Sequence, residues 1–238
     1  RIIRFIRFKI MYDLNIESTT SDAIKQNLDG IKKISKERIL IELLKILELK
    51  NIFKINESTK LKEIFSVIFP EFLYLKRLER LKKIYDVTRI NKEILLAALL
   101  IDEKDNHEYF AHKYNIASKL KKSLENLAHN LKNFKKDKNF LEKDLIKNIY
   151  IYGKNHLIAL ILINFSMNAK INIQEFSKSL NKILKTNIPK FHINGDYLKK
   201  NGMVEGEALG KVLNAIEKEW IDNSFSISKN RIVEIIKA

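Results

Sequence analysis

The sequence lacks cysteine and contains few of the residues that form tight turns. Of its 238 residues, 2 are proline and 6 are glycine. Without cysteine the chain has no disulfide framework, no thiolate metal site and no cysteine nucleophile. The scarcity of proline and glycine, beside abundant Leu, Ile, Lys, Glu and Asn, predicts a helical protein with few tight turns.

Long apolar runs are also missing. The longest one, LIALILINF at 157–165, is far shorter than the ~20 residues of a membrane span, and it predicts a buried helix. The basic, apolar opening RIIRFIRFKI has no stretch of small residues after it, so we expect no signal peptide. We therefore expect a cytoplasmic protein, in a reducing compartment, with no membrane partner.

The sequence contains no recognisable catalytic motif. The carboxylate cluster DEKD at 102–105 contains a lysine and lies at a helix end, so a solvated cap is its expected role. No phosphate-binding glycine loop and no nucleophile elbow occur. The histidines show no paired spacing with a third ligand; they are His107, His112, His129, His156 and His192. We predict no catalytic residue, no metal site and no cofactor in this chain.

The charge is the strongest global clue. The net charge is +16 and the isoelectric point is about 9.7, which favours a polyanionic partner, either nucleic acid or an anionic membrane surface. Part of the lysine content is also expected from the composition of an AT-rich coding sequence. Of the two partners, we favour nucleic acid.

Helical periodicity fills nearly the whole chain, and no convincing strand alternation appears. One helix is expected to end near Leu28, before Gly30, and KNFKKDKNF at 132–140 is expected to be a solvated connection. The expected caps are Ser18–Thr20, Ser35, Asn91, Asp105 and Asp137. Further helices are predicted at about 57–68, 71–85, 91–102, 106–114, 118–134, 138–151, 154–167, 173–186, 205–222 and 228–237. The predicted fold is an all-α, elongated helical array with a smaller module after Pro189.

The opening segment RIIRFIRF carries arginine at every third position. On a helix, Arg1, Arg4 and Arg7 fall within an arc of roughly 120° on an otherwise apolar surface. Such arginines usually meet carboxylates, phosphates or base edges. An ordinary surface face is the alternative.

The last module holds four of the six glycines, Gly195, Gly202, Gly206 and Gly210. Gly202 to Gly206 open a turn before an amphipathic helix, and the free N–H groups of a helix start can hold a phosphate. The alternative is a cap at Gly206 and close packing at Gly210, without a ligand.

Three stretches together resemble one family, the class II tRNA nucleotidyltransferases, which comprise the CCA-adding enzymes and the bacterial poly(A) polymerases. RIIRFIRF is similar to the neck helix, in which Glu-Asp-x-x-Arg runs into Arg-x-x-Arg-Phe, and Arg1 would close that motif. INGDYLKKNGMVEGEALGKVLNAIEKEW resembles the glycine-rich tail that ends in a tryptophan. ISKERILIELLKIL at 34–47 is similar to Ile-Ser-x-Glu-Arg-x-x-x-Glu-Leu, carried by Ser35, Glu37, Arg38, Glu42 and Leu43.

The resemblance implies a division into a neck at 1–50, a helical body at 51–188 and a tail at 189–238. It implies nucleotide binding by Arg1 and Arg4, with Arg7, Glu37 and Arg38 supporting the neck. For RNA binding it points to the tail residues Lys199, Lys200, Gly202, Gly206, Gly210 and Lys211. The catalytic head of the family is missing from these 238 residues.

The resemblance therefore predicts a chain that is inactive alone and holds the 3′ end of a tRNA or another RNA for a head domain. The complete enzyme would use Mg²⁺ with CTP and ATP. CCA addition and poly(A) addition are not distinguished by these motifs. Two alternatives stay open: a basic helical module that binds a protein or an anionic membrane surface, and a non-functional remnant of a split gene.

Overall fold

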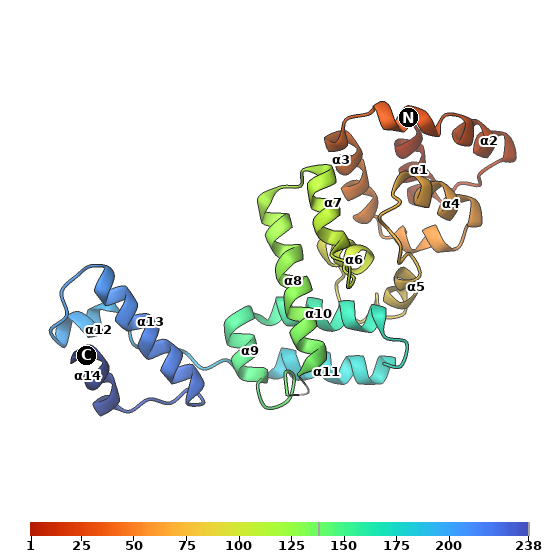
Figure 1. The fold of residues 1–238 in the computed structure, drawn as a ribbon. Helices are drawn as coiled ribbons and strands as arrows, with labels where there is room; N and C mark the ends of the chain where they lie inside the picture. Colours follow the sequence, from red (N-terminus) through yellow and green to blue (C-terminus); the bar gives the residue numbers. More distant parts are fainter. Residues whose placement is uncertain (138, 238) are drawn as a thin grey trace. The chain divides into compact units, whose positions relative to one another are not determined.

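The computed structural model describes residues 1–137 and 139–237. Within these residues it contains fourteen α-helices, two 3-10 helices and no strand, which confirms the all-α prediction (Figure 1). The chain divides into two compact units: unit 1 comprises Arg1–Lys138 and Asn155–Lys182, and unit 2 comprises Asn139–Lys154 and Ile183–Ala238. The division into neck, body and tail stays a prediction.

The first part of unit 1 is built from short amphipathic helices that bury one face each. Helix α1 contacts α3, and α4 contacts both η1 and η2. Ser58 begins α4 as expected of an N-cap, because its hydroxyl accepts a hydrogen bond from Leu61 N at 3.3 Å. The elements are α1 (Ile2–Tyr12), α2 (Ser18–Gln26), η1 (Leu28–Lys33), α3 (Lys36–Leu47), η2 (Ile52–Asn56) and α4 (Thr59–Ile68).

The remainder of unit 1 surrounds one helix that has hardly any polar surface. All seven residues from Ile94 to Leu100 on α6 are buried, and α6 contacts α3, α5, α7 and α8. Five of the seven are Leu or Ile, and each buried Leu or Ile contributes about 1.5–3 kcal/mol. The elements are α5 (Arg77–Lys82), α6 (Lys92–Leu100), α7 (Asn106–Tyr114), α8 (Ser118–Lys136), α10 (Lys154–Met167) and α11 (Ile173–Lys185). The first residue of α10 and the last three of α11 belong to unit 2.

Two arginines of α5 satisfy carbonyl groups at the ends of apolar helices. Arg77 Nη1 donates to Ala98 O and Ile101 O, both at 2.8 Å, at the end of α6. Arg80 donates from Nε to Phe165 O at 2.7 Å, and from Nη2 to Asn168 O at 2.9 Å and Ile171 O at 2.7 Å. Because the last carbonyls of a helix have no partner within it, these side chains stabilise the ends of α6 and α10.

Unit 2 has a smaller core. Helix α13 contacts both α12 and α14, and their fully buried residues are Leu198, Ile216 and Ile232. Beside them Trp220 packs against Tyr150, Phe191 and Phe225, with ring centroids 4.9–5.5 Å apart. The elements are α9 (Leu145–Tyr152), α12 (Gly195–Lys200), α13 (Glu207–Asp222) and α14 (Lys229–Lys237).

Aromatic contacts of α9 are reinforced by a hydrogen bond. Tyr150 Oη donates to a carboxylate oxygen of Glu217 on α13. Burial, together with this neighbouring carboxylate, raises the pKa of Tyr150 to about 12. Lys147 Nζ on α9 also lies 2.7 Å from Asp222 Oδ1. Two polar side-chain contacts therefore join α9 to α13.

The predicted helix ends are accurate where the apolar pattern is strong and wrong where turns intervene. Helices α7 and α10 have the predicted bounds, and Asn91 caps α6 by accepting from Ile94 N at 2.9 Å. Ser18–Thr20 do not cap α2, because they form its first turn and Glu17 is the N-cap. Helix α2 ends at Gln26, and Gly30 lies within η1.

Two predicted helices are too long. The helix predicted at 71–85 is reduced to α5, because Asn56 Nδ2 donates to Leu75 O at 2.7 Å and the flanking residues form turns. The helix predicted at 138–151 begins only at Leu145, since Asn148 Nδ2 donates to Phe140 O at 2.8 Å and holds the preceding turn.

The predicted connection at 132–140 also changes. Helix α8 continues to Lys136, and Asp137 follows its last turn instead of starting a helix. Residue 138 of this stretch lies outside the described residues.

We predict that Arg80→Lys lowers the free energy of unfolding of unit 1 by about 2 kcal/mol, because lysine keeps the charge but cannot span three carbonyls. Urea unfolding followed by circular dichroism would measure this change. Tryptophan fluorescence would not, because the only tryptophan of the chain belongs to unit 2. The control is Arg89→Lys, an exposed arginine. Equal effects of the two substitutions would contradict the assigned role.

A second prediction concerns pH. Burial lowers the pKa of His156, whose Nε2 lies 3.0 Å from Asn130 Nδ2. As pH falls below the unfolded value of about 6.5, the unfolded chain binds the proton first, so stability decreases with acidification. Urea midpoints measured from pH 7.5 to 5 should therefore fall less steeply for His156→Gln than for the parent chain. Parallel curves would show that His156 contributes nothing.

Candidate functional site

The three arginines of α1 do not remain a free stripe. Arg1 is exposed at the N-cap position. The Arg4 side chain is 70% exposed and that of Arg7 only 18%. The guanidinium of Arg7 also lies over the Phe8 ring, 5.1 Å from its centroid. The charge available to a ligand is therefore concentrated at Arg1 and Arg4.

Glu42 on α3 is the common partner of Arg4 and Arg7. Its Oε1 lies 3.7 Å from Arg4 Nε and 3.3 Å from Lys45 Nζ, and its Oε2 lies 3.3 Å from Arg7 Nη1. The Arg7 contact is an ion pair without hydrogen-bond geometry, since Arg7 Nε and Glu42 Oε2 make no hydrogen bond within the described residues. Because the Glu42 side chain is only 13% exposed, this acid fixes α1 on α3.

Glu37 and Arg38, the residues predicted to support the neck, lie elsewhere on α3. Both are exposed. Glu42 belongs to the motif that carries the family resemblance, but nothing in the pattern of that motif marks it as the partner of α1. Only the packing of α1 on α3 selects Glu42 among the acids of this helix.

Next to Arg1 the surface is hollowed. A groove of about 550 Å³ lies between α1, α2 and η1. Its lining is mostly apolar, with Arg1, Thr20 and Asn27 as polar exceptions. The predicted nucleotide-reading residue therefore lies at the edge of a cavity large enough for a small planar group.

The end of α1 is fixed by a further ion pair. Asp13 adopts a left-handed conformation with φ 53°, and Lys54 of η2 donates to its Oδ2 at 2.5 Å. That hydrogen bond holds the pKa of the Asp13 carboxyl below its usual value. The segment that follows α1 is thus anchored at its first residue.

In the tail, the predicted RNA-binding residues cluster around the start of α13. Gly206 is the N-cap, with φ 152°, and Gly202 has φ 94°. Two of the three lysines are paired with the acids that flank Gly206: Lys199 with Glu205 at 3.0 Å, and Lys211 with Glu207 at 2.8 Å. Lys200 is exposed, and Gly210 lies one turn into α13 with open space around it.

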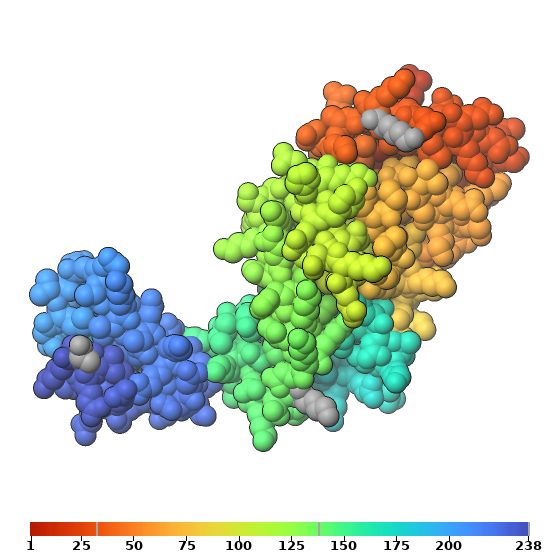
Figure 2. All heavy atoms as spheres, in the orientation of Figure 1, coloured from red at the N-terminus to blue at the C-terminus, as the bar shows by residue number. Residues whose placement is uncertain are grey.

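The lysine-rich face of α8 is a basic surface that the motifs do not predict. This helix carries six lysines and one glutamate. In Figure 2 its residues are the green spheres on the visible face of unit 1. Lys121 pairs with Glu125 at 3.8 Å and Lys132 with Asp105 at 3.4 Å. The exposed lysines outside these pairs are Lys119, Lys122, Lys135 and Lys136. The signal is present in the helical pattern, since the apolar stripe of α8 leaves every lysine on the opposite face.

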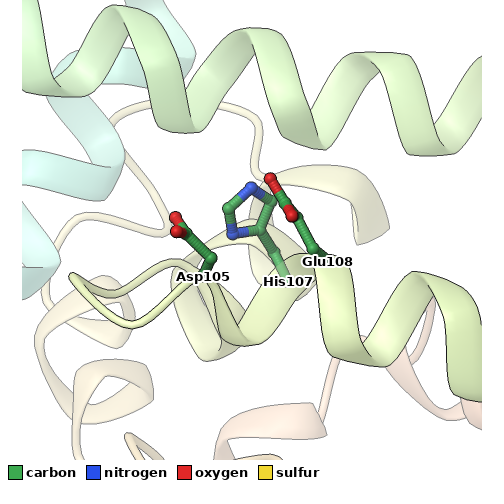
Figure 3. A group of neighbouring side chains, drawn as sticks. All are labelled: Asp105, His107 and Glu108. Carbon is green, nitrogen blue, oxygen red and sulfur yellow. The ribbon is translucent and has the colours of Figure 1, made fainter.

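Three side chains that carry no recognised motif come together at the start of α7. They are Asp105, His107 and Glu108, whose potential ligand atoms all lie within 4.8 Å of one another. Figure 3 shows the imidazole of His107 between the two carboxylates. The pattern of paired histidines that is typical of metal sites does not mark this group, because the group contains a single histidine.

Comparisons with known proteins point to one class. A family profile described as "Probable RNA and SrmB- binding site of polymerase A" matches residues 13–75. The chain is 25% identical over its whole length to a CCA-adding enzyme of Staphylococcus haemolyticus, covering 60% of that protein. It is 24% identical over 99% of its length to the mitochondrial CCA tRNA nucleotidyltransferase 1 of Danio rerio, covering 54%.

The fold has a solved counterpart. The Bacillus stearothermophilus CCA-adding enzyme, crystallised in complex with CTP, superposes with a TM-score of 0.63 at 16% identity, over 99% of this chain and 60% of that one. The chain is thus an all-α protein in which residues 13–75 resemble a region described as an RNA-binding site. The resemblance to class II tRNA nucleotidyltransferases is confirmed, and the chain spans about 60% of the length of the first CCA-adding enzyme it matches.

Within the described residues, no helix is both long enough and apolar enough to cross a membrane.

We predict that Glu42→Gln lowers the free energy of unfolding by about 2 kcal/mol, between the values for surface ion pairs and for buried pairs that lose one partner. The physical reason is that Arg7 would keep its charge in a largely buried position. Glu37→Gln, an exposed acid on the same helix, is the matched control and should change stability by less than about 0.5 kcal/mol. Thermal unfolding followed by circular dichroism would compare them; a larger effect of Glu37→Gln would favour Glu37 as the support of the neck.

Proposed function

We propose that this chain is the RNA-holding part of a tRNA nucleotidyltransferase, which binds the acceptor region of tRNA while a catalytic head adds nucleotides to the 3′ end. The observation that carries the proposal is similarity to CCA-adding enzymes along the entire chain. The family profile for an RNA-binding site supports the RNA partner. Mg²⁺, CTP and ATP belong to the complete enzyme in this proposal.

The distribution of charge supports contacts beyond the matched region. Residues 13–75 contain ten basic and ten acidic side chains, so this region has no net charge. The twelve residues before it carry four basic side chains and no acidic one, and the rest of the excess follows residue 75. The tail at 189–238 has eight basic and seven acidic side chains, so most of that excess lies between the matched region and the tail. Because phosphate neutralisation dominates RNA affinity, we infer that the lysines of α8 supply most of the attraction.

Within this proposal the two ends of the chain have different tasks. Arg1 contacts the incoming nucleotide at the apolar groove that it lines, and the exposed Arg4 contacts the nucleotide outside that groove. A guanidinium can hydrogen-bond a base edge. The tail residues near Gly206 contact the RNA backbone, and Lys200 is the strongest candidate because Lys199 and Lys211 are already paired with acids. Glu42 holds the side chains of Arg4 and Arg7 against α3 through its ion pairs with them.

Nucleotide addition needs carboxylates that hold two metal ions. Asp102 does not fit that role, because its Oδ1 accepts hydrogen bonds from Lys104 N at 2.9 Å and Asn106 N at 3.1 Å. We therefore assign no catalytic step to the residues of this chain, and the catalytic carboxylates belong to the head.

The test is RNA binding measured by fluorescence anisotropy at several salt concentrations. The chain should bind a tRNA acceptor minihelix more tightly than single-stranded RNA of equal length, since a helical array reads shape and backbone. The triple variant Lys119→Gln, Lys122→Gln, Lys136→Gln should bind more weakly and reduce the log–log salt slope by roughly 2–3, at about 0.7–0.9 per phosphate contact.

The matched control keeps the charge. Lys119→Arg, Lys122→Arg, Lys136→Arg should bind the minihelix like the parent chain. Arg1→Ala should also leave minihelix binding nearly unchanged, because this residue is assigned to the nucleotide. Equal affinity for both RNAs, or for vesicles of anionic lipid, would overturn the proposal and favour a generic basic surface.

A further inference from the structure

The start of α7 has an arrangement that RNA binding does not explain. Asp105, His107 and Glu108 lie at the helix N-terminus, and one carboxylate oxygen or ring nitrogen of each lies within 4.8 Å of those of the other two. In Figure 3 the imidazole ring stands between the carboxylates of Asp105 and Glu108. The cluster lies outside residues 13–75, which match the RNA-binding profile.

His107 is the unusual member of this group. Its exposed fraction is 3%, and Nδ1 is buried without a hydrogen-bond partner among the residues that the structure describes. Buried polar atoms are nearly always paired, and leaving one unpaired is unfavourable. A buried imidazole that lies beside two carboxylates and whose Nδ1 has no partner indicates that a ligand completes the site.

Asp105 is available because another acid performs its expected task. Asp105 is the N-cap residue, yet its side chain makes no capping hydrogen bond and its backbone is left-handed, with φ 55°. Asp102 Oδ1 instead accepts from the backbone N–H groups of Lys104 and Asn106. The Asp105 carboxylate, whose side chain is 51% exposed, therefore faces the cluster, where Lys132 Nζ lies 3.4 Å from its Oδ1.

We propose that Asp105, His107 and Glu108 bind a divalent transition-metal ion of the Zn²⁺ type. One imidazole with two carboxylates suits Zn²⁺ and its neighbours in the first row, whereas Mg²⁺ and Ca²⁺ prefer oxygen ligands alone. With metal–ligand bonds of about 2.0–2.2 Å, tetrahedral ligand atoms lie roughly 3.3 Å apart. Rotation of the two exposed carboxylate side chains supplies the remaining approach, while the buried His107 stays fixed.

Such an ion has a structural consequence for unit 1. It links the segment before α7 to the first turn of the helix, and Lys132 of α8 competes with it for the Asp105 carboxylate. Three protein ligands leave a fourth position for water. This proposal is independent of the RNA-binding function, because it concerns different residues and a different ligand.

The experiment is isothermal titration of the 238-residue chain, without a histidine tag, with Zn²⁺, together with visible absorption of the Co²⁺-substituted chain. We expect one ion per chain, a tetrahedral Co²⁺ spectrum and a higher unfolding temperature with Zn²⁺. Asp105→Asn with Glu108→Gln should weaken Zn²⁺ binding by at least about tenfold, since loss of even indirect support for a metal ligand has an effect of that size. Lys132→Gln should strengthen it, because the competing cation is removed.

His112→Gln is the matched control, because His112 is exposed on the same helix and should leave the Zn²⁺ affinity unchanged. The test relies on the two exposed carboxylates, so it does not depend on whether a substitution of the buried His107 folds. Absence of stoichiometric binding by the parent chain would overturn the proposal. Binding that survives Asp105→Asn with Glu108→Gln, or that is lost with His112→Gln, would also overturn it and assign the ion to surface histidines.

Discussion

The burial of α6 is the constraint on which unit 1 depends. A helix with seven consecutive buried residues has no face left for water, so other helices must cover it on every side. Helices α3, α5, α7 and α8 do so. The carbonyl groups at its end must also find donors inside the protein, and Arg77 provides them. The burial of the apolar helix α6 therefore requires a donor such as Arg77 near its last carbonyl groups.

This requirement separates the cations of the chain into two populations. Arg77 and Arg80 are engaged with backbone carbonyls, and Arg7 is held by Glu42. The lysines of α8, in contrast, lie on the face opposite its apolar stripe and remain exposed. Net charge alone does not distinguish these roles. In the proposed function, the surface that meets RNA is therefore mainly lysine, which suits backbone contacts that tolerate varied geometry.

The sequence predicts this fold wherever one pattern dominates a helix. The bounds of α7 and α10 follow from periodicity, whereas α5 and α9 are shortened by side-chain bonds to backbone from Asn56 and Asn148, which local pattern does not reveal. The site is predictable to a lesser degree. Arg1, Arg4 and Arg7 are visible in the sequence, but Glu42 becomes the partner of Arg4 and Arg7 only through packing. The left-handed backbone of Asp105 is likewise not visible in the sequence pattern.

The three carbonyl contacts of Arg80 also bear on the order of folding. They join residues 85 to 91 positions apart in the chain, so a long loop must close before any of them forms, and loop closure of that length is entropically unfavourable. Helices α6, α7 and α8 are neighbours in sequence and can assemble earlier. The end of α10 would then dock in a late step, and the hydrogen bonds of Arg80 would form after the transition state of folding. These bonds would therefore slow unfolding more than they accelerate folding.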